Sequence, residues 1–209
     1  MNASIIIATY GDEAWAEMAR ERALPSAQAQ DAHEVLVGHD PDATIAQARN
    51  ELAQHATGDW LCFLDADDEL GATYLRAMQR AWEQVGDDGI PRLLTPAVSY
   101  VRKGRKGPAR FLDRGIPLSD DNWLVVGTLV PRDLFMAVGG FHEAPHGFED
   151  WGLWAKCWKA GAEIVKVKDA VYYAHWNPSS KHHVGWRDRR WQVETHQRVR
   201  RELFPELTT

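Results

Sequence analysis

Residues 57–71 read TGDWLCFLDADDELG and place an apolar run directly before a cluster of acids. The run from Trp60 to Leu64 has the length of one strand, and three aspartates follow it within four residues. Strands that are apolar on both faces are typical of parallel sheets covered by helices on both sides. The stretch therefore predicts an α/β fold with carboxylates at the carboxyl end of one strand.

The same succession of strand and helix occurs on both sides of this stretch. Short apolar runs over residues 4–9, 35–37 and 60–64 predict strands, and each is followed by a helical stretch that ends near residue 24, 55 or 85. The cap of the middle helix is expected at Asp42 or Thr44. Three such units in succession predict a Rossmann-like, mostly parallel sheet with right-handed crossovers.

The second half of the chain has fewer helices. Strands are expected over 93–101 and 125–130, on either side of a loop rich in Gly, Lys and Arg. A helix over 148–160, late strands over 163–167 and 171–173, and a C-terminal helix over 186–204 follow. Without a linker or repeat, we expect one domain over 1–209: a single sheet flanked by helices, with a smaller antiparallel element and a C-terminal helix.

Composition excludes several classes of protein. A net charge of −6 argues against a general nucleic-acid binder. No apolar run approaches the roughly 18–20 residues that cross a bilayer, and no basic segment precedes the first apolar run, so we expect neither a membrane span nor a signal peptide. Cys62 and Cys157 lie in separate apolar patterns, which indicates two buried thiols and a cytoplasmic setting.

Polar side chains follow each of the three N-terminal strands at its end. They are Thr9 to Asp12, Asp40, and Asp65 to Asp68. In open parallel sheets ligands bind beyond the carboxyl ends of the strands, so this half is expected to bind a nucleotide. The chain contains neither G-x-G-x-x-G nor G-x-x-x-x-G-K-[ST], which argues against a dinucleotide dehydrogenase and a P-loop enzyme.

The acids over residues 65–69 repel one another unless a proton or a cation lies between them. Two carboxylates about 4 Å apart cost about 4 kcal/mol at an effective dielectric constant near 20. A hard divalent ion with oxygen ligands, Mg²⁺ or Mn²⁺, would remove this cost. The alternative is that the acids cap the helix that begins near Gly71.

Several of these motifs together resemble the family 2 glycosyltransferases of the A-type fold. The matching motifs are Thr9-Tyr10, Asp40, Ala48-Arg49-Asn50, the stretch from Thr57 to Asp68, Gly139 to Glu143, and Gly147 to Trp154. They occur in the family's order and spacing, and the resemblance covers about residues 3–176. The chain departs from the family pattern at Gly152 and at the loop Gly38-His39-Asp40. These departures affect the expected donor specificity more than the reaction type.

The resemblance implies a donor site and a metal site. Tyr10, Asp12 and Asp40 would contact the nucleobase or ribose, Arg49 the base or phosphates, and Asp65 the ribose, with Thr9 and Ala66 in the same site. Asp67 would bind the metal. His175 resembles a late histidine that completes the metal shell in some A-type enzymes, although a histidine after a strand is more often a structural hydrogen-bonding residue.

The resemblance also implies catalytic and acceptor residues. Asp150 would take the proton of the acceptor hydroxyl, and Glu149 would orient or bind. Both acids open a predicted helix, so helix capping is the alternative. Trp151 would form an acceptor platform or, alternatively, a core residue. Residues 177–185, with Lys181, His182 and His183, have the composition of a lid.

The implied function is metal-dependent, inverting transfer of a sugar from a nucleoside-diphosphate sugar, with a UDP-sugar favoured. The acceptor would be the hydroxyl of a glycan, lipid-linked, protein or small molecule. Residues 1–100 would bind the nucleotide, 101–180 the acceptor, and 181–209 would form the lid and terminal helix. That helix is basic, so it either contacts an anionic membrane or polyanionic acceptor or is a solvated helix.

Two other functions stay open at this point. A nucleotidyltransferase shares the nucleotide-binding half, but its basic, Gly-rich loop after the first strand is replaced here by Gly11-Asp12-Glu13. A catalytically silent module that binds nucleotide sugars or glycans is the other alternative. Nucleoside-diphosphate binding that requires Mn²⁺, together with slow donor hydrolysis, would favour an enzyme over such a module.

Overall fold

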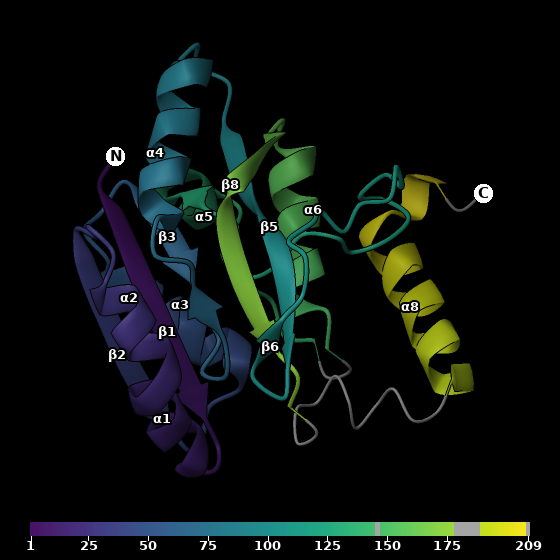
Figure 1. Ribbon diagram of the computed structural model, residues 1–209. Coiled ribbons are helices and arrows are strands. Elements are labelled where there is room, and N and C mark those ends of the chain that lie inside the picture. Colours follow the sequence, from purple (N-terminus) through teal and green to yellow (C-terminus); the bar gives the residue numbers. More distant parts are fainter. Residues whose placement is uncertain (145–146, 178–188, 208–209) are drawn as a thin grey trace.

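A computed structural model describes residues 1–144, 147–177 and 189–207. Four strands form the N-terminal sheet in the order β2-β1-β3-β7 (Figure 1). They are β1 (Ala3–Tyr10), β2 (Glu34–Asp40), β3 (Trp60–Phe63) and β7 (Val130–Pro131). β2 and β3 run parallel to β1, and only β7 is antiparallel to its neighbour. The three predicted N-terminal strands and their parallel order are confirmed.

A second sheet has the order β4-β8-β5-β6. Its strands are β4 (Glu69–Leu70), β5 (Arg92–Arg102), β6 (Arg105–Lys106) and β8 (Glu163–His175). The long strands β5 and β8 are parallel, and the short strands β4 and β6 add antiparallel edges. Leu94 and Leu129 exchange backbone hydrogen bonds of 3.0 and 2.9 Å, which joins this sheet to the first beside β7. The predicted fold class is therefore confirmed.

Helices cover both sheets. They are α1 (Ala14–Met18), α2 (Leu24–Gln28), α3 (Ile45–His55), α4 (Tyr74–Val85), α5 (Arg132–Ala137), α6 (Glu149–Lys159) and α8 (Arg189–Leu203), with a 3₁₀ turn at Pro205–Leu207. A π-helical turn, Ala19–Ala23, joins α1 to α2 as one helical segment. Thr44 and Gln47 form a capping box that starts α3, so Thr44 is the cap and Asp42 is not.

The predicted strand over 125–130 is wrong except at its end. In the described part of the chain only Val130 of that range lies in a named strand. The backbone amide of Thr128 donates to the carbonyl of Val125 in a turn. The reason is Gly127, whose missing side chain leaves room for the ring of Tyr172, and whose carbonyl accepts the Tyr74 hydroxyl at 2.5 Å. Buried tyrosines therefore hold a turn where apolar residues suggested a strand.

The two predicted late strands are one strand. β8 runs through residues 168–170, and a register shift opposite Pro96/Ala97 accommodates the polar residues between its two apolar halves. Such a bulge lets a strand continue where its alternation is interrupted. As a result β8 is one continuous strand from Glu163 to His175.

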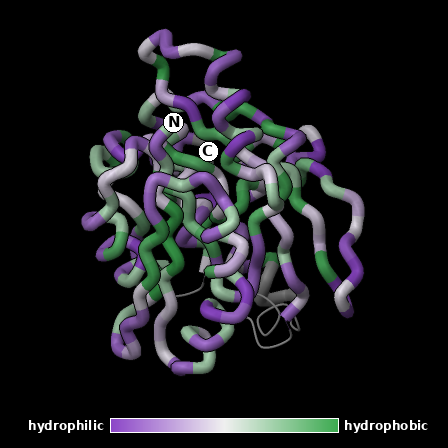
Figure 2. Tube along the Cα trace, turned by 60° about the vertical axis from the view of Figure 1, so that its left-hand side comes forward, coloured by the Kyte–Doolittle hydropathy of each residue, from purple (hydrophilic) through white to green (hydrophobic). Residues whose placement is uncertain are grey.

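The core lies between the sheets and the helices. Hydrophobic stretches run through the middle of the molecule, and hydrophilic ones gather in the peripheral loops (Figure 2). Cys62 and Cys157 are buried free thiols, as predicted, and burial raises the pKa of each to about 12. Within the described residues no helix is long and apolar enough to cross a membrane.

Candidate active site

The first two strand ends are tied together by the Thr9 hydroxyl. Its Oγ1 lies 3.2 Å from the carbonyl oxygen of Gly38 and 3.0 Å from Nδ1 of His39. The parallel register places Tyr10 beside Asp40. Residues from the first and second strands therefore lie together at one sheet edge.

Asp12 and Asp40 each use one carboxylate oxygen to hold a turn. Oδ1 of Asp12 accepts the amide of Ala14 at 2.9 Å, and Oδ1 of Asp40 accepts the amide of Asp42 at the same distance. Asp12 is exposed and Asp40 is half-buried. Both carboxylates keep further lone pairs for a ligand at this edge.

Arg49 connects three of the motifs. Its guanidinium is 6% exposed, and it donates to Asp65 Oδ1 at 2.6 Å and to Glu149 Oε1 at 2.9 Å. Burial opposes the charge of Arg49, but Asp65 and Glu149 outweigh it and raise the pKa of Arg49 above its usual value. One buried cation thus holds the acidic loop after β3 against the start of α6.

Removing this cation is expected to destabilise the fold. In Arg49→Met, two carboxylates lose their buried partner, and such a loss costs about 3–5 kcal/mol. Urea unfolding measures the change in the free energy of unfolding. Arg20→Met is the matched control, because Arg20 pairs with Glu13 at 3.0 Å at a site where both side chains are 58% exposed, which is worth at most about 1 kcal/mol. Equal stability of the two variants would contradict the role assigned to Arg49.

The acids after β3 have separate partners. Asp65 binds Arg49, and Asp68 Oδ1 accepts the backbone amide of His175 at 2.8 Å. Glu69 Oε2 lies 2.5 Å from His175 Nε2. Asp67 Oδ2 accepts the Asn177 side-chain amide at 3.0 Å.

Helix capping does not account for these acids. Helix α4 begins after Thr73, and two of its first amides have other partners: that of Tyr74 donates to the carbonyl of Gly71 at 2.9 Å, and that of Leu75 to Oε1 of Gln30 at 3.3 Å. The four acidic side chains over 65–69 instead contact α3, β8 and Asn177. The capping alternative is therefore not what the contacts show.

The cluster keeps an excess of negative charge. Burial, followed by repulsion from Asp67, raises the pKa of Asp68 well above its usual value. Burial and Asp67 also raise the pKa of Asp65, although Arg49 acts in the opposite direction. Asp67, which is half-buried, is thus the acid that a cation would stabilise most directly at this edge.

Asp67 offers carboxylate oxygens, which are the donor type that hard ions such as Mg²⁺ prefer. Among residues 1–144, 147–177 and 189–207, no group of three or more His, Cys, Asp or Glu side chains is arranged to hold a metal. Mg²⁺ commonly binds one or two protein carboxylates and takes its other ligands from water and substrate phosphates. The imidazole of His175 is paired with Glu69, so its contacts here are those of a structural hydrogen-bonding residue.

Asp150 is held from two sides at the start of α6. Its Oδ2 accepts the side-chain amide of Asn122 at 2.9 Å, and its Oδ1 accepts the amide of Trp151 at 2.8 Å. Burial first, and then the neighbouring Glu149, raise the pKa of Asp150 to about 7. A carboxylate with this pKa is suited to accept a proton near neutral pH.

Two features of this region were not predicted. Asn122 belongs to no motif, and only the fold brings it to Asp150, 28 residues away. Phe148, directly before α6, has a φ of 70°, which is unusual for a bulky residue and indicates backbone strain next to Glu149. Strain of this kind is common at functional sites.

Trp151 lies in the core. Its side chain is fully buried, and its indole Nε1 donates to the carbonyl of Leu118 at 2.8 Å. Its ring packs near His196 and Phe204. An indole buried in this way presents no face to an acceptor, so the core alternative accounts for Trp151.

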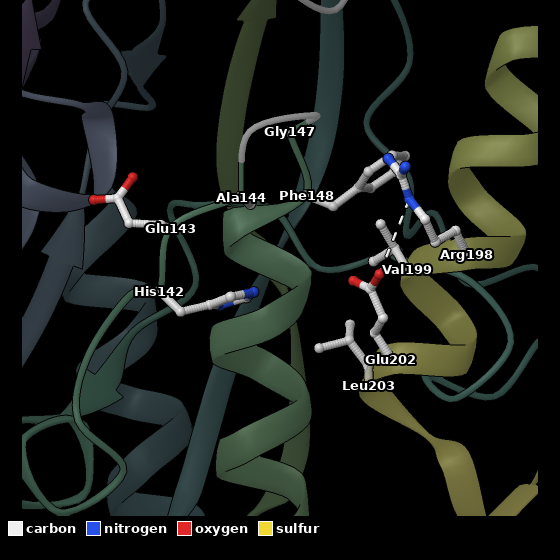
Figure 3. A pocket seen from close by; sticks show the side chains of 9 residues that line it. All are labelled: His142, Glu143, Ala144, Gly147, Phe148, Arg198, Val199, Glu202 and Leu203. Atoms are coloured by element: carbon white, nitrogen blue, oxygen red, sulfur yellow. Dashed lines mark ion pairs between the residues drawn. The ribbon is translucent and has the colours of Figure 1, made fainter.

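A cavity of about 370 Å³ lies beside α6 and α8 (Figure 3). Its lining includes His142, Phe148, Arg198 and Glu202, and the last two form an ion pair at 3.9 Å. The ring of His142 occupies the space that a side chain at position 152 would fill. Gly152, where the family often has an acid or polar residue, is thus explained by packing.

Helix α8 packs on α6 and on the loop before β7. Phe204 at its end is fully buried beside Trp158. Arg200 binds Asp120 at 2.6 Å, and His196 binds Asp121 at 3.1 Å. The predicted lid over 177–185, including Lys181, His182 and His183, lies outside the described residues except at its first position.

Comparisons with known proteins show which family and which fold this chain is similar to. Residues 22–94 match the family described as "Glycosyl transferase family 2". A crystal structure of S. aureus TarS is similar with a TM-score of 0.62 at 18% identity, covering 85% of this chain and 37% of TarS. No curated protein matches the sequence.

Two structures of TarS residues 1–349 carry ligands. The complex with UDP-GlcNAc has a TM-score of 0.63 at 16% identity over 87% of this chain and 60% of that one. The complex with UDP has a TM-score of 0.61 at 17% identity over 85% and 61%. This chain thus spans less than two thirds of the length of these structures, and the likeness shows a shared fold.

Proposed function

We propose that this chain, which has a family 2-like glycosyltransferase fold, transfers a sugar from a nucleoside-diphosphate sugar to a hydroxyl acceptor with inversion and with the help of a divalent metal. The observation that carries the proposal is the contact of Arg49 with both Asp65 and Glu149. It joins the acids that follow the nucleotide-binding strands to the acids that open α6. This contact supports a donor site and a catalytic base that lie close to each other.

The donor would lie at the carboxyl ends of β1, β2 and β3. Thr9, Tyr10, Asp12 and Asp40 would face its nucleoside, with Asp65 and Ala66 next to them. The complexes of TarS with UDP-GlcNAc and UDP support a UDP-sugar, since TarS has the same fold. Arg49 would act here through Asp65, because its guanidinium is already engaged by two carboxylates.

Asp67 would hold Mn²⁺ or Mg²⁺, and His175 would be a second ligand only after leaving Glu69. When bound, the ion would neutralise charge on the departing diphosphate. Asp65 and Asp68 would add to the negative field that favours a cation at this edge.

Asp150 would accept the proton of the acceptor hydroxyl. The acceptor oxygen then forms a bond to the anomeric carbon as the bond from that carbon to the diphosphate oxygen breaks. The bonding electrons leave with the nucleoside diphosphate, and a single displacement inverts the anomeric centre. Arg49 keeps Glu149 beside the base, and Asn122 keeps the carboxylate of Asp150 in place.

Asn122→Ala is expected to move the pH dependence of turnover. The Asn122 amide donates to Asp150 and stabilises its ionised form, so the loss of this bond raises the pKa of Asp150 further. Since the base must be ionised, the acidic limb of kcat moves to higher pH by about one unit. Steady-state rates from pH 5.5 to 9 measure the shift. Ser119→Ala is the control, because the Ser119 carbonyl and not its side chain binds Arg200. A uniform loss of rate without a shift would contradict the role of Asn122.

The proposal is tested by incubation with a panel of nucleotide sugars and Mn²⁺. Release of a nucleoside diphosphate, with calorimetric binding of the same nucleotide that depends on Mn²⁺, is the expected result. Binding without any release would indicate a silent nucleotide-sugar module. Release of pyrophosphate from a nucleoside triphosphate and a sugar phosphate would indicate a nucleotidyltransferase.

A further inference from the structure

The end of β5 and strand β6 carry a concentration of positive charge. Residues 102–114 contain six basic residues in 13 positions, in a chain whose net charge is −6. These six are Arg102, Lys103, Arg105, Lys106, Arg110 and Arg114, which we call the basic hairpin. All six are exposed. Such a local excess is opposite in sign to the rest of the protein and favours an anionic partner.

The charges of the basic hairpin are not neutralised within the described part of the chain. The acid of the segment, Asp113, forms its ion pair with Lys166 instead. None of the ion pairs found among the described residues includes a member of the basic hairpin. Clustered like charges without ion-pair partners repel one another, and a bound polyanion would relieve this repulsion.

The basic hairpin lies at the same end of the second sheet as the candidate metal site (Figure 1). Val101 pairs with Lys106 on one side and with His175 on the other. Strand β8 in turn pairs with β4, which follows the acidic loop. With neighbouring strands about 4.8 Å apart, three steps place β6 about 14 Å from β4. An extended ligand on the basic hairpin can therefore reach the transfer site.

Aromatic side chains accompany these charges. Nζ of Lys106 lies 3.5 Å from the ring centroid of Tyr173, and Arg102 lies 5.5 Å from that of Trp176. Tyr100 is 52% exposed and Trp176 is 48% exposed. Exposed aromatic rings beside cations suit a ligand that combines sugar-like faces with anionic groups.

The size of the charge cluster indicates which anion it fits. A donor diphosphate carries two phosphates, whereas six cations are spread along the basic hairpin. The stretch RKGRKGPAR over 102–110 has no large apolar side chain, and Phe111 and Leu112, which follow it, are half-buried. The basic hairpin therefore has no exposed large apolar residue that would enter a bilayer. A chain with repeated anionic groups matches the cluster better than either alternative.

We propose that the basic hairpin binds a polyanionic acceptor, a chain with repeated phosphate or carboxylate groups, and guides one of its hydroxyls to the transfer site. This inference rests on the proposed glycosyl transfer. Direct contacts would be salt-dependent, because each one releases counterions from the acceptor. Phosphate and carboxylate polymers would bind through the same charge interaction. Inorganic polyphosphate and polygalacturonate, used as separate probes, distinguish between them.

The first experiment compares two triple variants that remove the same charge. Arg102→Gln/Arg105→Gln/Lys106→Gln alters the basic hairpin, and Arg76→Gln/Arg80→Gln/Lys168→Gln alters exposed positions on α4 and β8. Binding of inorganic polyphosphate and of polygalacturonate is followed by tryptophan fluorescence at several salt concentrations. The hairpin variant is expected to bind at least about tenfold more weakly, with a salt slope reduced by about one for each cation that no longer touches the polymer. Equal binding by both variants would overturn the proposal.

The second experiment separates this inference from the proposed function. Calorimetric binding of UDP and donor hydrolysis should be unchanged in the hairpin variant. If the unaltered protein does not hydrolyse any donor, the proposed glycosyl transfer is overturned. If the hairpin variant binds the polyanions as tightly as the unaltered protein does, only this inference is overturned. Hairpin-dependent binding that is tighter to vesicles of phosphatidylcholine and phosphatidylserine at 3:1 than to both acidic polymers would also overturn it.

Discussion

Asp150→Asn is expected to lower the rate of sugar transfer by about 10³-fold and to leave donor binding unchanged. The substitution keeps the size of the side chain but removes its ability to take a proton, and general-base catalysis typically contributes 10²–10⁴-fold. The side-chain amide of Asn122 and the backbone amide of Trp151 hold the two oxygens of this carboxylate, and neither amide can take its place as a base. Single-turnover transfer rates, with UDP binding measured in parallel, separate the two effects.

Stability distinguishes this loss from misfolding. A carboxyl whose pKa is about 7 in the folded state binds protons more tightly there than in the unfolded chain, so it lowers stability as pH rises through the two values. Asp150→Asn should therefore be at least as stable as the unaltered protein at pH 8. Asp169→Asn, which alters an exposed acid on β8, is the control for turnover. Full activity of the Asp150 variant would remove this residue from the mechanism.

The N-terminal half of the fold could be predicted because its signals are local. Ile5, Ile6 and Ile7 are fully or almost fully buried on both faces of β1, as an unbroken apolar strand requires. The capping box at Thr44 likewise lies within four residues. Patterns of this length are present in the sequence before any tertiary contact forms.

The second half depended on contacts between distant residues. The turn at Gly127 exists because Tyr74 and Tyr172 occupy the space above it, 53 and 45 residues away. Asn122 reaches Asp150, 28 residues away, and the neighbouring acids, Asp120 and Asp121, bind residues of α8. No local pattern encodes these arrangements, so sequence reasoning could not find them.

The acidic cluster shows which part of the site could be predicted. Repulsion among acids that follow a buried strand was visible in the sequence, and the raised pKa values of Asp65 and Asp68 agree with it. The partner of each acid could not be predicted. Arg49 was expected to meet the nucleotide, yet its guanidinium is buried between Asp65 and Glu149. A buried cation with two acids is satisfied by the protein itself.

Asp67→Asn is expected to abolish the enhancement of UDP binding by Mn²⁺ and to lower transfer by about 10²–10³-fold, the usual effect of removing one stabilising interaction with a leaving group. Calorimetry of UDP binding with and without Mn²⁺ measures the first effect independently of turnover. Asp31→Asn, an exposed acid after α2, is the control and should keep the enhancement. An equal enhancement in the Asp67 variant would place the metal elsewhere.

The same substitution should leave the fold as stable as before, or more stable. Asp67 raises the pKa values of Asp65 and Asp68, so its charge opposes theirs in the folded state. Removing that charge relieves the repulsion, while the Arg49 and His175 contacts of the two neighbours persist. A variant that gains thermal stability and loses metal-dependent binding would indicate that the repulsion among these acids serves to bind a cation. A loss of both would instead assign Asp67 a structural role.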